Sequence, residues 1–85
     1  MKEKIRQIVG DHAGLVTKIE SLDTSSDLYS AGMTSHSSVN LMLALENEFG
    51  FEFPPELLNR SVFESIDSIA IAIEALLPEE SHSRL

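Results

Sequence analysis

The chain contains no cysteine among its 85 residues, and this absence limits the folds open to it more than any other feature. Small domains often rely on disulfides or on a thiolate-bound metal, and neither can form here. A domain of this size buries only about 60% of the surface that its unfolded chain exposes. Amphipathic elements must therefore supply the core. A module that presents or binds a group suits this size better than a self-contained enzyme, because an enclosing cleft would consume much of the core.

Two segments in the first half of the chain carry apolar residues at helical spacing. The first runs from Lys2 to about Val16 and has charged residues on its other side. The second begins at Ser35 or Ser37 and ends at Phe49. Because it is apolar on more than one face, we expect it to be the most buried helix. Gly50 suits the left-handed residue that follows a helix.

A further helical pattern covers Ile66 to Leu77, and Pro78 ends it. Its start is open, because Ser65 or Asp67 could cap it and the sequence of residues 61–64 also matches a capping box. Between the second and the last helix, prolines interrupt the chain, and we expect only a short helical turn over Glu56 to Asn59.

We expect a long ordered loop over Glu20 to Met33, because the apolar side chains of Leu28 and Tyr29 would anchor it to the core. No segment predicts a β-sheet. The fold class is therefore all-α: a small four-helix bundle with three main helices, one short helix and a long loop between the first two helices. We expect a single domain over residues 1–78 and a flexible tail over residues 79–85.

The formal net charge of −8 and the scattered Lys and Arg residues make nucleic acid an improbable partner. An acidic surface favours basic patches on other proteins, or it only keeps a small apolar domain soluble. No stretch reaches the roughly 18 apolar residues of a membrane span, and the sequence "MKEKIRQIVG" lacks the apolar centre of a signal peptide. We expect a cytoplasmic monomer without membrane insertion.

The sequence "GMTSHSS", residues 32–38, places hydroxyl groups directly before the second helix. Thr34 or Ser35 could cap the helix, which would be a sufficient structural reason for either residue. The positive end of the helix would also favour a phosphate ester on Ser35. A hydrolase that uses Ser35 with His36 or His12 is a weaker alternative, because no G-x-S-x-G turn and no orienting third group is present. His12 is expected to be a partly buried packing residue of the first helix.

The segment from Asp27 to Pro54, "DLYSAGMTSHSSVNLMLALENEFGFEFP", resembles the central motif of acyl carrier proteins. The matching features are an Asp-Leu pair, a Gly, a serine that opens the second helix, a Val-x-Leu run, a Leu-Glu-x-Glu-Phe ending and a Pro after a short connector. The order of the helices also agrees with that family over about residues 2–77.

This resemblance implies that Ser35 carries 4′-phosphopantetheine, which a Mg²⁺-dependent phosphopantetheinyl transferase transfers from coenzyme A. An acyl or aminoacyl group would form a thioester with the thiol of this arm. The protein would then be no enzyme but a substrate of an acyl- or amino-acid-activating ligase and of a downstream transferase. No catalytic residue and no metal site is implied. The alternative is an acidic helical interaction module in which Ser35 only caps the second helix.

The chain departs from the family pattern around the serine. Thr34 and His36 stand where the family usually has Asp and Leu, and two positions that are often acidic are Ser37 and Asn40. Those acidic positions generally face basic patches of fatty-acid enzymes, and only Glu46 and Glu48 keep the pattern. These six residues are the candidates for partner recognition. The departures indicate a specialised carrier that resembles the stand-alone aminoacyl carriers, with lipid or secondary metabolism as the other possible context.

Overall fold

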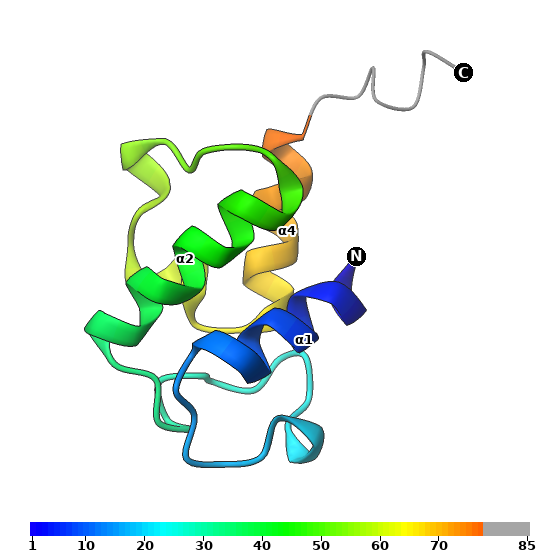
Figure 1. Cartoon of the computed structure of the whole chain (residues 1–85), viewed down its shortest axis with the longest axis vertical. Coiled ribbons are helices and arrows are strands. Elements are labelled where there is room, and N and C mark those ends of the chain that lie inside the picture. The colour runs from blue at the N-terminus through cyan, green and yellow to red at the C-terminus, as the bar shows by residue number, and fades with distance from the viewer. Residues whose placement is uncertain (78–85) are drawn as a thin grey trace.

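The computed structural model describes residues 1–77, which form four α-helices and two short 3₁₀ helices (Figure 1). In chain order the elements are α1 Lys2–His12, η1 Ile19–Ser21, α2 Ser35–Phe49, η2 Pro55–Leu57, α3 Arg60–Phe63 and α4 Ile66–Leu76. No strand occurs in this part of the chain. The predicted all-α class, with three main helices and one short helix, is confirmed. The tail predicted over residues 79–85 and the stop at Pro78 lie outside the described residues.

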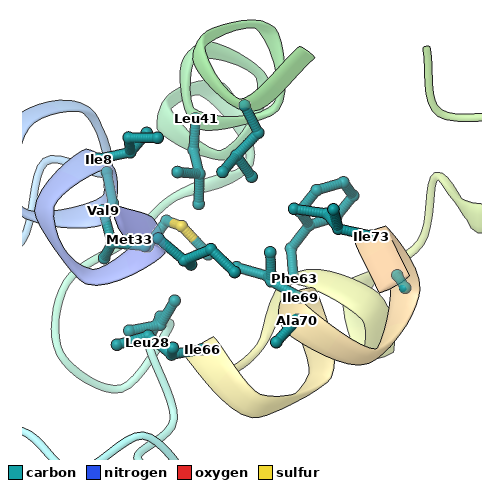
Figure 2. Packing of buried hydrophobic residues seen from close by; sticks show 14 of the residues in the cluster. Ile8, Val9, Leu28, Met33, Leu41, Phe63, Ile66, Ile69, Ala70 and Ile73 are labelled. Carbon is teal, nitrogen blue, oxygen red and sulfur yellow. The ribbon is translucent and has the colours of Figure 1, made fainter. Parts of the chain in front are cut away.

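The core is one cluster that all four α-helices and the first long loop share (Figure 2). Its buried members are Ile5, Ile8, Val9, Ala13, Leu28, Met33, Leu41, Leu45, Phe53, Phe63, Ile66, Ile69, Ala70, Ala72 and Ile73. Two edge-to-face aromatic pairs, Phe51 with Phe53 and Phe53 with Phe63, join the connector after α2 to this cluster.

The prediction that the second helix would be the most buried is wrong. Only Leu41 and Leu45 of α2 are buried, whereas Val39 is 49% exposed and Leu43 is 53% exposed. Five residues of α4 are buried. The reason is that only one side of α2 faces the core. Its two buried residues are four positions apart on that side, so apolar side chains on the other sides of the helix reach the surface.

The first helix ends earlier than predicted. It stops at His12, where the N–H of Ala13 donates to the carbonyl of Val9, and Gly14 follows with a left-handed φ of +66°. Leu15 packs against the core from beyond this turn, and Val16 is 87% exposed. His12 is exposed as well, so the prediction that it packs partly buried against the core is wrong.

The loop between α1 and α2 is ordered by contacts at both ends, as predicted from Leu28 and Tyr29. Leu28 is fully buried, and its N–H donates to the carbonyl of Glu64 at 2.7 Å. Arg6 donates to the carbonyls of Ile19 and Leu22, each at 2.9 Å. This loop delivers the chain to the first residue of α2.

The short helix expected over residues 56–59 is divided and displaced. The structure has the 3₁₀ turn η2 and then the separate helix α3, whose first turn is capped by Asn59. The Oδ1 atom of Asn59 accepts from the N–H of Val62 at 3.1 Å. Asn59 therefore begins a helix rather than ending one, because its side chain replaces a missing backbone partner.

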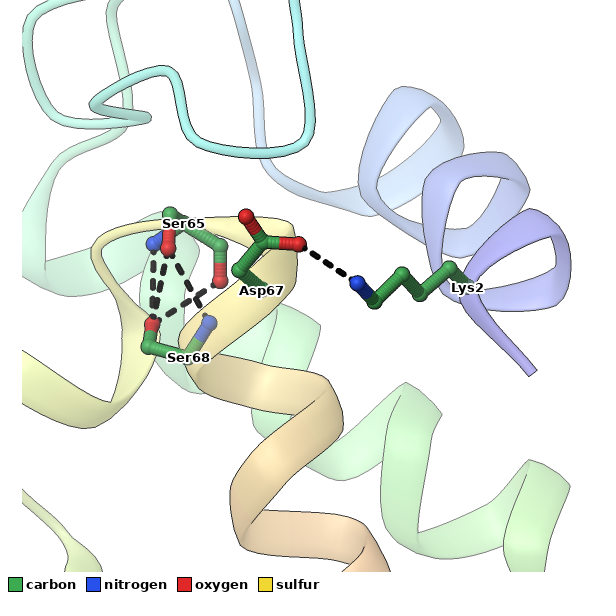
Figure 3. A network of polar contacts seen from close by, with 4 residues as sticks. All are labelled: Lys2, Ser65, Asp67 and Ser68. Atoms are coloured by element: carbon green, nitrogen blue, oxygen red, sulfur yellow. Dashed lines mark hydrogen bonds and ion pairs between the residues drawn. The ribbon is translucent and has the colours of Figure 1, made fainter.

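Ser65 is the residue that caps α4 (Figure 3). Its Oγ accepts from the N–H of Ser68, and the Oγ of Ser68 accepts from the N–H of Ser65, at 3.0 and 3.1 Å. Asp67 lies in the first turn of α4, and its Oδ1 lies 2.9 Å from Lys2 Nζ. The bond with Lys2 and then that with the Thr24 side chain lower the pKa of Asp67, and they outweigh partial desolvation, which raises it.

Candidate functional site

Thr34 and Ser37 fix the start of α2. The Oγ1 of Thr34 accepts from the N–H of Ser37 at 3.1 Å, and the Oγ of Ser37 accepts from the N–H of Thr34 at 2.8 Å. This is a reciprocal capping box in which Ser37 takes the place that Glu or Gln often occupies. Of the two residues that could cap the helix, Thr34 does so, and the capping role does not fall to Ser35.

Ser35 is the first residue of α2, and it is exposed. Its hydroxyl makes no hydrogen bond with any described residue, while its carbonyl accepts from the hydroxyl of Ser38 at 2.7 Å. The first N–H groups of a helix have no intrahelical partner, and the helix dipole is positive at this end. Ser35 thus presents a free hydroxyl where a phosphate ester would be stabilised.

A groove of about 450 Å³ begins at Ser35 and lies between α2 and the segment from Leu58 to Phe63. Figure 1 shows the chain after α2 turning back past this helix to reach α4. The lining is mostly apolar and includes Val39 and Met42 of α2. At the edge of the groove, the guanidinium carbon of Arg60 lies 4.0 Å from the centre of the Tyr29 ring.

Asp27 organises the loop beside this groove. Its carboxylate accepts from the N–H of Tyr29 at 2.9 Å and from the hydroxyl of Ser30 at 3.1 Å. Partial desolvation raises the pKa of Asp27, but the bonds from Tyr29 and Ser30 and the charge of Arg60 together hold it below its usual value. Asp27 therefore stays ionised at neutral pH and helps to hold Tyr29 in place.

The other candidates for partner recognition lie in different environments. His36 and Asn40 are exposed on α2, close to Ser35 in the sequence. Glu46 is partly buried, and its carboxylate accepts from the N–H of Phe53 at 2.9 Å, which holds the connector after the helix. Glu48 lies 3.6 Å from Lys4 Nζ. Recognition by these residues stays a prediction, and Glu46, Glu48 and Ser37 each have a contact within the fold.

Sequence reasoning missed the groove and Arg60 as part of this site. Leu58 and Arg60 are far from Ser35 along the chain, and no local pattern links them to it. The link is tertiary, because Tyr29 of the first loop supports Arg60 of α3 beside the start of α2.

The described residues show no arrangement that favours an enzyme. Ser35 Oγ makes no hydrogen bond with His12 or His36, and residues 1–77 contain no group of three or more potential metal ligands.

Within this range no helix is long and apolar enough to cross a membrane. Two other cavities, of about 700 and 620 Å³, lie beside α1, and Ser35 lines neither of them.

Residues 3–73 match the family of the phosphopantetheine attachment site. The aminoacyl carrier protein of Agrobacterium fabrum (strain C58 / ATCC 33970) is 40% identical over 77 residues, which are 91% of this chain and 93% of that protein.

Two solved structures have similar folds. One is the crystal structure of an engineered Bradyrhizobium japonicum glycine:carrier protein ligase complexed with carrier protein from Agrobacterium tumefaciens and AMP. It matches with a TM-score of 0.83 and 40% identity, over 87% of this chain and 99% of that chain. The solution structure of a holo acyl carrier protein from Nitrosomonas europaea matches with a TM-score of 0.76 and 30% identity, over 95% of this chain and 96% of that chain.

The residues around Ser35 fit a phosphopantetheine group. The exposed hydroxyl has no partner among the described residues, the start of α2 favours a phosphate, and the adjacent groove offers an apolar surface with one cation. The chain belongs to the phosphopantetheine attachment site family: it is a carrier protein that bears an acyl or aminoacyl group as a thioester on a covalent 4′-phosphopantetheine arm, and it is a substrate of other enzymes rather than an enzyme.

Proposed function

We propose that Ser35 Oγ is the attachment atom of the arm. The observation that carries this proposal is the division of roles at the start of α2, where Thr34 and Ser37 complete the capping box and leave the hydroxyl of Ser35 without a partner among the described residues. The arm supplies a thiol that the cysteine-free chain lacks. The protein supplies a rigid helix start that presents the attachment point and stabilises the phosphate there.

The cargo that we propose is an aminoacyl group. Support comes from the relative that is an aminoacyl carrier protein at 40% identity, and from the glycine:carrier protein ligase in the similar crystal structure. A ligase that activates an amino acid would load the arm, after a phosphopantetheinyl transferase has installed it, and a downstream transferase would accept the cargo. The chain would act as a cytoplasmic monomer among these enzymes.

The exposed face of α2 supports a specialised partner. His36, Val39, Asn40, Leu43 and Asn47 are all exposed, and none of them is an Asp, Glu, Lys or Arg. Glu46 and Glu48 contact other parts of the fold. An enzyme that recognises carriers through a basic patch would find little complementary charge here. A ligase with a neutral docking surface is the better match.

Loading with an amino acid tests the cargo. The holo protein would be incubated with ATP, Mg²⁺, glycine and a glycine:carrier protein ligase, and the product analysed by intact mass before and after hydroxylamine treatment. We expect an added glycyl group that hydroxylamine removes, as it does from a thioester. Ser35→Ala should abolish loading, and Ser38→Ala should retain it. Loading with fatty acids by an acyl-activating ligase, together with no loading by any amino acid, would contradict an aminoacyl cargo.

A further inference from the structure

Arg60 is the cation best placed to meet a group attached to Ser35. It is the first residue of α3, and it lines the same groove as Ser35. The guanidinium carbon lies over the ring of Tyr29, 4.0 Å from the ring centre. A guanidinium held over an aromatic ring by cation–π attraction can still donate from those of its five N–H groups that point away from the ring.

The donors of Arg60 have no partner among the described residues, whereas the side chains of Asn59 and Ser38 in the same groove are engaged. Arg60 has no ion pair or hydrogen bond with the residues of the described range. Asn59 uses its oxygen to cap α3 and its amide to donate to the carbonyl of Glu56 at 3.1 Å. The hydroxyl of Ser38 donates to the carbonyl of Ser35. Among the described residues that line this groove, Arg60 is thus the one charged side chain.

The remaining cations of the described range lie elsewhere. Lys2 pairs with Asp67, Lys4 lies near Glu48, and Arg6 holds two carbonyls of the first loop. Lys18 has no such contact among residues 1–77, but it does not line the groove. Because the chain has a net charge of −8, a further negative charge at Ser35 meets repulsion from the rest of the molecule, and a local cation would offset it together with the positive end of α2.

We propose that Arg60 binds the phosphodiester of the arm and so directs the arm into the groove beside α2. This inference rests on the proposed attachment at Ser35. A phosphodiester is a monoanion with two unesterified oxygens, and the fork of a guanidinium can donate to both. Arg60 is a binding residue for the arm, and Tyr29 positions it.

Nuclear magnetic resonance of the holo protein tests the contact, after intact mass has shown that the arm is attached. We expect attachment to shift the Nε–Hε signal of Arg60 and the backbone amides of residues 58–63. We also expect the ³¹P signal of the holo protein to move in Arg60→Gln and to stay in place in Lys18→Gln, which removes the same charge outside the groove. Arg60→Lys should give an intermediate position, and added NaCl should move the wild-type signal toward that of Arg60→Gln.

The outcomes separate this inference from the attachment proposal. A mass gain with no shift at Arg60, or with the same ³¹P signal in the wild type and Arg60→Gln, would overturn the role of Arg60 alone. A mass gain that Ser35→Ala does not abolish would overturn attachment at Ser35, and with it this inference. Circular dichroism of each variant should match the wild type, because Arg60 and Lys18 are exposed.

Discussion

At the scale of single residues, four neighbouring hydroxyl side chains adopt three different bonding arrangements. Thr34 and Ser37 bond to each other's backbone, Ser38 donates to the carbonyl of Ser35, and Ser35 itself is free among the described residues. The sequence left the cap open between Thr34 and Ser35, because both side chains can accept a backbone N–H. Only the backbone conformation decides, since Thr34 is extended and Ser35 is already helical.

Substituting Thr34 and Ser35 in turn should show which of the two residues stabilises the fold. Thr34→Ala should lower the free energy of unfolding by about 1 kcal/mol, because the N–H of Ser37 loses its acceptor. Ser35→Ala should leave it within about 0.5 kcal/mol of the wild type, as is usual for an exposed side chain without such a role. Urea denaturation measures both values. A larger loss in Ser35→Ala than in Thr34→Ala would show that the cap is assigned to the wrong residue.

At the scale of elements, sequence periodicity identified α1, α2 and α4 but misjudged their ends and their burial. Helical spacing cannot tell a core face from a groove or an exposed face, so α2 was expected to be more buried than it is. The end of α1 was missed because Leu15 continues the apolar spacing after the chain has turned at Gly14. The sequence did not separate η2 from α3, because Asn59 can cap a helix only when its backbone is extended, and the sequence does not reveal that conformation.

A matched pair on α2 tests the burial that the structure assigns. Leu41 is fully buried and Leu43 is 53% exposed on the same helix. Leu41→Ala should cost about 2–5 kcal/mol of unfolding free energy, because it removes core contacts and leaves a cavity. Leu43→Ala should change it by less than about 0.5 kcal/mol. Equal losses in the two variants, measured by urea denaturation, would contradict the orientation of α2.

The contact between α1 and α4 should make stability depend on pH. The folded protein lowers the pKa of Asp67 through Lys2 and Thr24, so its ionised form stabilises the fold. This contribution to stability is complete at pH values above the pKa of Asp67 in the unfolded chain, which is near 3.8. It disappears as the pH falls through the lower pKa of the folded protein.

Asp67→Asn should therefore be less stable than the wild type at pH 7, and the difference should shrink as the pH falls below about 3.8. Urea midpoints at a series of pH values measure this difference in stability. The stability of Lys2→Gln should depend less on pH than that of the wild type. A difference that stays constant down to the lowest pH would show that Asp67 does not titrate in this way.

At the scale of the whole molecule, a strongly acidic chain presents an uncharged face on α2 next to Ser35. The family motif allowed the fold, the attachment serine and the carrier role to be expected from the sequence, because many spaced residues agree with it. The groove was not expected, since it is formed by Tyr29, Arg60 and α2, which meet only in the folded chain. The contacts of Glu46 and Glu48 could not be predicted from the sequence either, because they too form only in the folded chain.

The uncharged face should determine which enzymes accept the carrier. His36→Leu with Asn40→Glu should raise acceptance by general fatty-acid enzymes about two- to fivefold, since an exposed ion pair is worth up to about 1 kcal/mol. Loading by the native ligase should fall by a similar factor. Ser37 stays unchanged because it holds the capping box. Gln7→Glu adds the same charge on α1 as a control. Steady-state rates measure acceptance, and unchanged rates with both enzymes would place specificity outside α2.

The central claim is that this carrier receives its arm on Ser35. The apo protein, Ser35→Ala and Ser38→Ala would each be incubated with coenzyme A, Mg²⁺ and a broad-specificity phosphopantetheinyl transferase, and then weighed intact by mass spectrometry. We expect a gain of one phosphopantetheine in the wild type and in Ser38→Ala, and no gain in Ser35→Ala. A folded wild type that gains nothing with several transferases, or a Ser35→Ala variant that still gains the arm, would contradict the claim.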